Sequence, residues 1–158
     1  MKKILFSLLI GIAILFLTPP IEAQEGSDIR EEMIYNILVD RFNNGDPTQS
    51  EQVDIEDPYA YHGGDLQGIT MKLDHIKKLG FTTISLSSIM ENAPNGFHGY
   101  WVENHYEIEE QLGTFDDLEV LIRGAHSRNI KVILEFNTNY VAANHPHVND
   151  PDKADWFK

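Results

Sequence analysis

The strongest constraint on the fold is the regular alternation of strand-like and helix-like runs along this chain of 158 residues. Three apolar runs with strand character are separated by two runs that place apolar residues at helical spacing. In chain order the expected elements are a strand at 33–39, a helix at 66–79, a strand at 81–86, a helix that begins at Thr114 and a strand at 131–136. Strands that alternate with helices predict an α/β fold with a parallel sheet.

Long polar segments follow the carboxyl ends of the three predicted strands. Residues 43–60, residues 87–110 and the run from 137 onward show neither strand nor helix spacing and are expected to be loops. The carboxyl ends of parallel strands are where α/β proteins build their binding and catalytic sites. We therefore look for functional residues in these three segments.

The start of the chain has the composition of a cleavable export signal, residues 1–23. A short positive stretch precedes an uncharged apolar run at 4–17, and a polar region that ends at Ala23 follows it. The apolar run is about 14 residues long, whereas a helix that spans a bilayer needs about 20, so a retained anchor is the weaker alternative. We expect a secreted or extracytoplasmic protein with a flexible lead-in at 24–32 and one domain at 33–158.

Charge and cysteine content exclude several classes of partner. The net charge is −13, which disfavours nucleic acid and anionic lipid surfaces. The chain has no cysteine, so neither a disulfide nor a lipid-modified cysteine can form. A metal bound by oxygen atoms is a remaining way to stabilise an exported fold. We expect no nucleic-acid partner and no membrane attachment after removal of the signal.

Five short motifs follow one another along the chain. They are Val39-Asp40-Arg41-Phe42, Asn44-Gly45-Asp46, Gly63-Gly64-Asp65-Leu66-Gln67-Gly68, Gly99-Tyr100-Trp101 and Gly113-Thr114-Phe115-Asp116-Asp117-Leu118. In this order they resemble the N-terminal part of the catalytic barrel of the α-amylase family, glycoside hydrolase family 13. The resemblance implies a partial TIM (β/α)8 barrel comprising its first three β/α units with parallel strands. It also implies an enzyme of carbohydrate metabolism that acts on α-glucans, either starch-like or maltooligosaccharides.

The family's catalytic carboxyl groups lie after later strands than the three found in this chain. Retaining cleavage of a glycosidic bond needs two carboxyl groups about 5–5.5 Å apart. No pair among the 158 residues corresponds to them by motif, so we assign no catalytic residue and expect the isolated chain to be inactive. Two alternatives stay open: a non-catalytic carbohydrate-binding or interaction protein derived from the family, and a truncated reading frame without a role.

The resemblance implies that Tyr100, His98, Glu135 and Tyr140 contact the sugar. Tyr100 matches a residue of the family whose ring stacks on a sugar. Glu135 stands where the family usually has Asp, and Tyr140 stands where it has a His that donates a hydrogen bond to the sugar. Both departures change the chemical group that would meet the substrate. The alternative for the aromatic residues is packing of the loop onto the barrel, which is our interpretation of Trp101.

The resemblance also implies a calcium site formed by Asn44, Asp46, Asp65 and the carbonyl oxygen of Gly63. Calcium takes about six to eight oxygen ligands from carboxylates, amide side chains and backbone carbonyls, and this set offers all three kinds. The alternative is a loop of Asx turns in which Asn44 and Asp46 bond to their own backbone. Asn139 matches a ligand of a second calcium in relatives, and the other ligands of that site would lie beyond this chain.

Overall fold

The computed structural model describes residues 28–49 and 53–157. The chain divides into two units, Met1–Arg30 and Glu31–Lys158. The export signal predicted for 1–23 and the first part of the predicted lead-in lie outside the described residues. None of the helices within the described ranges has the length and apolar character needed to cross a bilayer.

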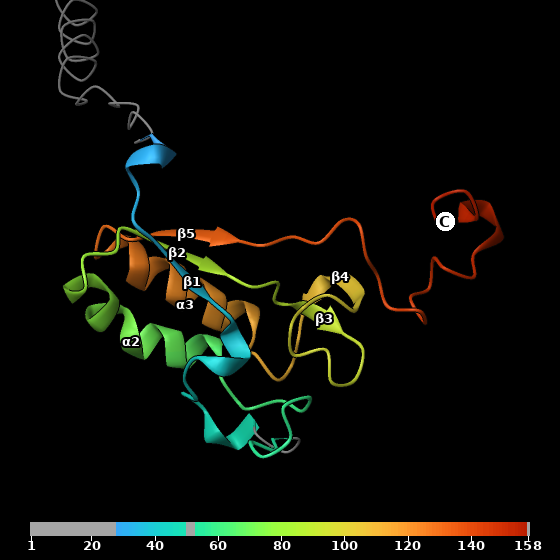
Figure 1. The fold of residues 1–158 in the computed structure, drawn as a ribbon, viewed down its shortest axis with the longest axis horizontal. Coiled ribbons are helices and arrows are strands. Elements are labelled where there is room, and N and C mark those ends of the chain that lie inside the picture. The colour runs from blue at the N-terminus through green and yellow to red at the C-terminus, as the bar shows by residue number, and fades with distance from the viewer. Residues whose placement is uncertain (1–27, 50–52, 158) are drawn as a thin grey trace, which may run out of the picture. The chain divides into compact units, whose positions relative to one another are not determined.

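The second unit contains a three-stranded parallel sheet with two α-helices, drawn in Figure 1. The strands lie in the order β1 (Ile34–Ile37), β2 (Thr83–Leu86) and β5 (Lys131–Leu134). Helix α2 (Leu66–Lys78) connects β1 to β2, and helix α3 (Phe115–His126) precedes β5. The predicted α/β class with parallel strands is therefore confirmed, although each strand is shorter than its predicted range.

The core of the unit lies between the sheet and the helices. Ile84 and Leu86 of β2 are fully buried in one apolar cluster with residues of both helices. Successive side chains of a strand point to opposite faces of the sheet. The row of paired residues that contains Ser85 therefore lies on the face opposite to Ile84 and Leu86. That row joins Asn36, Ser85 and Ile133, and Ile133 is 37% exposed. Leu134, which shares the face of Ile84 and Leu86, is 38% exposed, so β5 keeps apolar side chains in contact with solvent on both faces.

Helix α2 has a clear start, buried stripe and end. Its four fully buried side chains recur at helical spacing: Leu66, Ile69, Leu73 and Ile76. Each such side chain contributes about 1.5–3 kcal/mol when it is withdrawn from water. The Asp65 carboxylate caps the first turn by accepting the Gly68 N–H at 2.5 Å. Gly80 follows the last turn with φ +93°, a conformation that glycine adopts at low cost.

Helix α3 follows the predicted start at Thr114 and begins with a capping box formed by Thr114 and Asp117. The Thr114 hydroxyl accepts the Asp117 N–H at 3.2 Å, and the Asp117 carboxylate accepts the Thr114 N–H at 2.9 Å. These two bonds satisfy backbone donors that the first helical turn leaves unpaired. Leu121 and Ala125 form the buried side of the helix. Asn129 then takes φ +52° just before the chain enters β5.

The prediction of a loop at 87–110 is wrong, because this segment contains an antiparallel hairpin. Strand β3 (Met90–Asn92) pairs with β4 (Val102–Ile108), and the register shifts on both sides of Glu91. Strand β4 is mostly polar and partly exposed, so it lacks the apolar alternation that identifies a half-buried strand. The hairpin stands at the carboxyl end of β2 and carries the loop 93–101.

The amino ends of the three parallel strands are joined by the side chain of Glu32. One carboxylate oxygen lies 2.5 Å from the Lys131 ammonium group at the start of β5. The other accepts hydrogen bonds from the Thr82 and Thr83 hydroxyls at 2.5 and 2.8 Å. The Glu32 side chain is only 6% exposed, whereas that of Lys131 is 45% exposed, so the carboxylate is buried and the ion pair is partly open to solvent. Short 3₁₀ turns complete the described elements: Ile29–Glu31, Val39–Arg41, Pro47–Gln49 and Pro151–Lys153.

Candidate functional site

A hollow of about 440 Å³ lies at the carboxyl ends of the three parallel strands. Strand ends and the hairpin loop supply its lining: Asn36, Ile37, Leu38, Ser85, Ser87, His98, Tyr100 and Glu135. Three of the four residues predicted to contact sugar, His98, Tyr100 and Glu135, therefore surround one space. They meet there because parallel strands end at the same edge of the sheet and their following loops share that edge.

His98 and Tyr100 form a stacked pair of rings at this hollow. Their centroids are 5.3 Å apart and their planes differ by 22°. The Tyr100 N–H donates to Nδ1 of His98 at 3.0 Å, so in neutral His98 the proton is on Nε2. Burial lowers the pKa of His98, which favours this neutral form. The pair presents the Tyr100 ring, 46% exposed, beside a potential hydrogen-bond donor.

Gly99 allows the tight approach of this loop to the end of β2. It takes φ +80°, and a Cβ at this position would lie 2.5 Å from the carbonyl oxygen of Ser88. Any other residue would have to shift the backbone there. The Gly99 carbonyl also accepts the side-chain N–H of Asn137 at 2.8 Å, which ties the loop to the segment after β5. The ring pair thus stands on a closely packed turn.

The fourth predicted sugar contact, Tyr140, lies away from the hollow. Tyr140 and Asn139 line a different space of about 630 Å³, together with Trp156 from the last described turn. Tyr140 is 67% exposed. Glu135, by contrast, is fixed by its backbone, whose N–H donates to the Leu86 carbonyl at 3.0 Å. Among the described residues that line the first hollow, Glu135 is the single carboxylate.

The predicted calcium residues of the loop after β1 are folded by hydrogen bonds of the carboxylates to backbone N–H groups. One Asp65 oxygen accepts the N–H groups of Gly45 and Asp46 at 2.9 and 2.8 Å, and the other caps α2. Asp46 accepts the backbone N–H and the hydroxyl of Thr48 at 3.0 and 2.6 Å, which is an Asx turn. The structure therefore brings Asp46 and Asp65 into one folded loop, and the Asx turn at Asp46 is one of the two that the alternative interpretation expects.

The donor set of this loop fits calcium by ligand type. A carboxylate offers about four acceptor positions, and Asp65 uses three of them for backbone N–H groups. About one position of Asp65 is left for a cation, beside the Asn44 amide, Asp46 and the Gly63 carbonyl. Within the described ranges, no three His, Asp or Glu side chains converge into a metal-binding group. Calcium at this loop stays a prediction.

Asp40 organises the same loop, although its sequence position gives no hint of this role. It is 1% exposed and accepts the N–H groups of His62 and Gly63 at 2.9 and 3.0 Å. The Arg41 Nε lies 2.7 Å from its second oxygen. Burial raises the pKa of Asp40, and the two N–H groups and the Arg41 charge act against that rise. The motif that contains Asp40 and Arg41 carries the family resemblance, but a buried ion pair cannot be read from a motif.

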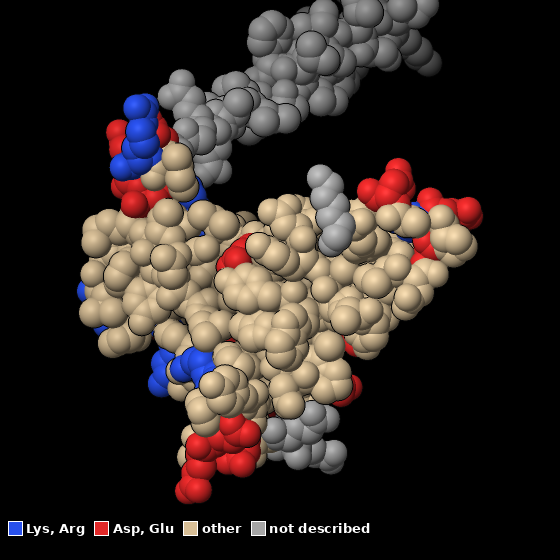
Figure 2. Space-filling model, turned by 45° about the vertical axis from the view of Figure 1, so that its right-hand side comes forward, with Lys and Arg blue, Asp and Glu red and all other residues tan. Residues whose placement is uncertain are grey.

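Acidic groups dominate the charged surface of the described part of the chain. Figure 2 shows Asp and Glu side chains at the margins of the visible face, with few Lys or Arg and a wide uncharged area between them. This distribution agrees with the net charge of −13. It favours a neutral ligand over an anionic one.

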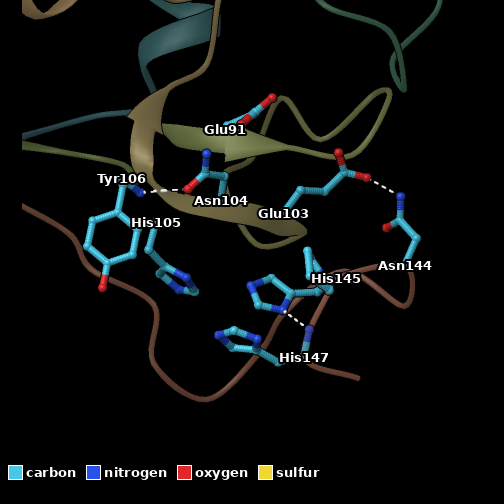
Figure 3. Close-up of a pocket in the computed structure, with 9 residues that line it drawn as sticks. Glu91, Glu103, Asn104, His105, Tyr106, Asn144, His145 and His147 are labelled. Atoms are coloured by element: carbon cyan, nitrogen blue, oxygen red, sulfur yellow. Dashed lines mark hydrogen bonds between the residues drawn. The ribbon is translucent and has the colours of Figure 1, made fainter. Parts of the chain in front are cut away.

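A second hollow, of about 520 Å³, lies between β4 and the segment after β5 and is drawn in Figure 3. Three imidazole rings form a row there, with centroids 5.8 Å apart for His105 and His145 and 4.8 Å apart for His145 and His147. His145 is buried, and its Nδ1 accepts the His147 N–H at 3.1 Å. Burial, followed by the charges of neighbouring groups, lowers the pKa of His145. This shift favours the neutral form of His145 within the row.

Comparison with known proteins agrees with this geometry. A family model described as "Alpha amylase, catalytic domain" matches residues 36–158. A β/α-amylase of Paenibacillus polymyxa is 38% identical over 140 residues, which are 83% of this chain and 12% of that protein. The crystal structure of an Anoxybacillus α-amylase is 56% identical with a TM-score of 0.77, over 80% of this chain and 28% of that one. The α-amylase of Geobacillus thermoleovorans, solved with acarbose, is 52% identical with a TM-score of 0.74, over 80% of this chain and 27% of that one.

The fold and the hollow at its strand ends define a part of a β/α-barrel glycoside hydrolase. The chain belongs to the α-amylase family, glycoside hydrolase family 13, and corresponds to the N-terminal part of the catalytic domain. It spans 12% of the Paenibacillus relative and 28% of the Anoxybacillus structure, so it covers only a part of their barrels.

Proposed function

We propose that this chain supplies the first part of the α-glucan-binding site of an exported α-amylase-type glycoside hydrolase. The observation that carries the proposal is the meeting of His98, Tyr100 and Glu135 around one hollow at the strand ends. An exposed aromatic face, a ring N–H and a carboxylate are the groups that stack on a sugar ring and bond its hydroxyls. Apart from Glu135, the residues that line the hollow carry no Asp, Glu, Lys or Arg side chain, which supports a neutral substrate such as a maltooligosaccharide.

Binding of maltoheptaose to the purified chain tests this proposal. Isothermal titration should detect binding by the wild type and a loss of about tenfold or more in Tyr100→Ala, because the stacking surface is removed. Tyr106→Ala is the matched control, since Tyr106 is 87% exposed and lies on β4 outside the first hollow. Equal affinity of the Tyr100→Ala variant and the wild type would refute the assignment of the hollow.

We further propose that the 158-residue chain does not cleave α-glucan by itself. Among the described residues, the hollow contains the single carboxylate Glu135, and retaining cleavage needs a second one about 5–5.5 Å away. A reducing-sugar assay on soluble starch should therefore show no turnover, and clear turnover would contradict the proposal. The same assay bears on the second candidate function, a non-catalytic carbohydrate-binding protein. Binding without cleavage both by this chain and by any longer product of its gene would favour that candidate.

Calcium is proposed as a ligand of the loop after β1, held by Asn44, Asp46, Asp65 and the Gly63 carbonyl, with Asn139 as one ligand of a second site. When bound, the ion would neutralise the two carboxylates of the loop. At a free concentration one hundred times the Kd, calcium stabilises the folded chain by about 2.7 kcal/mol. Urea unfolding in calcium and in chelator measures this difference. The stabilisation by calcium should be smaller in Asn44→Ala and unchanged in the control Asn144→Ala. Equal unfolding midpoints of the wild type in calcium and in chelator would refute the site.

Export is proposed from the signal-like residues 1–23, which lie outside the described part of the chain. Expression with the native start should yield a processed protein in the extracytoplasmic fraction. Mass spectrometry should then find Gln24 as its first residue. A cytoplasmic product that retains Met1 would contradict both the signal and the predicted localisation.

A further inference from the structure

We propose that Arg41 is a positioning residue for the His98–Tyr100 ring pair; this inference rests on the proposed sugar-binding function of the hollow. Arg41 itself does not line that hollow. Its effect would pass through Phe97, which lies between the Arg41 guanidinium and His98. The sequence places Arg41 in a family motif but assigns no role to its side chain.

The guanidinium group of Arg41 is fixed along its edge by the loop after β1. Nη1 lies 2.7 Å from Nε2 of His62, and Nη2 donates to the Ala60 and Pro58 carbonyls at 2.8 and 3.1 Å. Nε lies 2.7 Å from the buried Asp40 carboxylate. A planar guanidinium with partners along its edge has one orientation, so its flat face is a rigid surface.

That flat face lies against Phe97. The guanidinium carbon is 3.9 Å from the ring centroid of Phe97, within the range of a cation–π contact. Phe97 then meets His98 edge to face, with centroids 5.2 Å apart. His98 stacks on Tyr100 at 5.3 Å. A continuous series of contacts thus runs from the loop after β1 to the ring that faces the hollow.

Apart from Arg41, the hairpin loop is held by its own turns, by the Gly99–Asn137 bond and by packing of Phe97 against the core. Its backbone turns through Asn95 and Gly99, both with positive φ, and lies outside the ladder of β3 and β4. Two short turns close it, with the Gly96 N–H on the Ala93 carbonyl and the Gly99 N–H on the Gly96 carbonyl. These bonds fix the chain but do not select the orientation of the Phe97 ring. Arg41 supplies a fixed plane for that ring.

Trp101 gives an optical readout of this arrangement that is independent of sugar. Its ring meets His98 edge to face at 4.8 Å, so its environment follows the position of His98. The chain has two tryptophans, and a Trp156→Phe background leaves Trp101 as the single tryptophan, which can be excited selectively. In that background, Arg41→Met should increase acrylamide quenching of Trp101 and weaken maltoheptaose binding about tenfold. Arg41→Lys should be intermediate, because an ammonium group keeps the charge but not the plane.

Arg123→Met is the matched control, because Arg123 is an exposed residue of α3 whose loss removes the same charge. It should leave both the quenching and the affinity unchanged. Where Arg41→Met fails to fold, Phe97→Leu replaces it, since this change removes the ring and keeps the bonds of Arg41. In the double variant Arg41→Met/Phe97→Leu the loss of affinity should equal that of one single variant, because both changes break the same contact.

Unchanged Trp101 quenching and affinity in a folded Arg41→Met or Phe97→Leu variant would overturn the proposal. A role in folding alone would lower the unfolding midpoint and leave the affinity per folded molecule intact, which also overturns it. Failure of the wild type to bind maltoheptaose would instead remove the proposed function of the hollow. In that case the Trp101 quenching still decides whether Arg41 positions the ring pair.

Discussion

The loop after β1 and the segment after β5 both leave the carboxyl edge of the sheet, but they are held in place by different kinds of contact. In the loop after β1, the carboxylates of Asp40 and Asp65 are buried and accept backbone N–H groups. In the segment after β5, residues such as Phe136, Tyr140 and Trp156 are more than half exposed. Its links to the hairpin include the imidazole row and a backbone bond from Ala142 to Val102 at 2.9 Å.

This difference separates the part of the site that is preformed from the part that is not. Buried carboxylates with several donors fix a loop strongly, because losing one partner leaves an uncompensated charge. Exposed side chains and imidazole rings contribute less and respond to the solvent. We therefore expect substitutions in the loop after β1 to change the stability of the whole unit. Changes in the segment after β5 should act locally.

The largest expected effect is that of Asp40→Ala. Removing this carboxylate leaves the Arg41 charge and two N–H groups without their partner, which should lower the free energy of unfolding by about 3–5 kcal/mol. The control is Asp74→Ala, which breaks an exposed ion pair with Arg128 and should cost far less, because exposed pairs are screened by solvent. Urea unfolding followed by circular dichroism measures both. Similar losses in the two variants would remove the basis of the comparison.

Asp65→Ala should have the next largest effect, about 2–3 kcal/mol. It removes the cap of α2 and also the acceptor of the Gly45 and Asp46 N–H groups. Thr114→Ala removes the corresponding cap of α3 and should cost about 1 kcal/mol, because Thr114 holds a single helix start. The same unfolding measurement compares the two caps. A greater loss in Thr114→Ala would mean that the loop after β1 gains no stability from Asp65.

Lowering the pH should destabilise the segment after β5 and leave the loop after β1 protected. The pKa of His145 is lowered by burial and by His147, His105 and Lys153, and Glu103 acts in the opposite direction. The folded pKa thus lies below the unfolded value of about 6.5, so this stabilisation is complete above about pH 6.5 and falls as the pH drops toward the folded pKa. Once His145 takes up a proton, its charge disfavours the buried position in the imidazole row.

Hydrogen exchange at about pH 7.5 and about pH 5, corrected for intrinsic rates, tests this prediction. Residues 142–157 should lose protection at the lower pH while residues 38–48 keep theirs. His145→Phe preserves a ring and should abolish the pH effect, whereas the exposed control His126→Gln should leave it unchanged. Equal loss of protection in both regions would show that the imidazole row does not set the pH response.

The smallest expected effect is that of Asn144→Ala. The Asn144 amide donates to the Glu103 carboxylate on β4 in an exposed hydrogen bond. Its removal should change the free energy of unfolding by less than about 0.5 kcal/mol. A loss above about 2 kcal/mol would mean that the segment after β5 stabilises the unit as strongly as the loop after β1 does.

The sequence predicts the parallel sheet and both helices because their burial is periodic. The stripe from Leu66 to Ile76 and the capping pair Thr114 and Asp117 are local patterns, and the structure reproduces them within about a residue or two. The β3–β4 hairpin is missed because strand pairing with shifted register and a polar outer surface leaves no period in the chain. The predicted strands are too long at their ends; Val39, for example, begins a 3₁₀ turn instead of continuing β1.

The candidate site shows the same division between local and spatial information. His98, Tyr100 and Glu135 meet as the parallel topology requires, because each follows the end of a strand. Tyr140 and Asn139 lie at a different space, since the chain beyond β5 turns away toward β4. The roles of Asp40 and Arg41 depend on burial by a loop that is distant in sequence. Such burial has no local signature, so only the structure reveals it.

The carboxylate of Glu32 has a mechanical consequence for the sheet. It connects the start of β1 to residues at the start of β2, through Thr82 and Thr83, and to Lys131 at the start of β5. At the opposite edge, where the hollow opens, the Ser87 hydroxyl accepts the Val39 N–H at 3.1 Å and joins the ends of β1 and β2. At the same edge, the Glu135 N–H donates to the Leu86 carbonyl at 3.0 Å and joins the ends of β2 and β5. The three strands are therefore tied together at both ends, so the edge that lines the hollow is held in place from both sides before any ligand arrives.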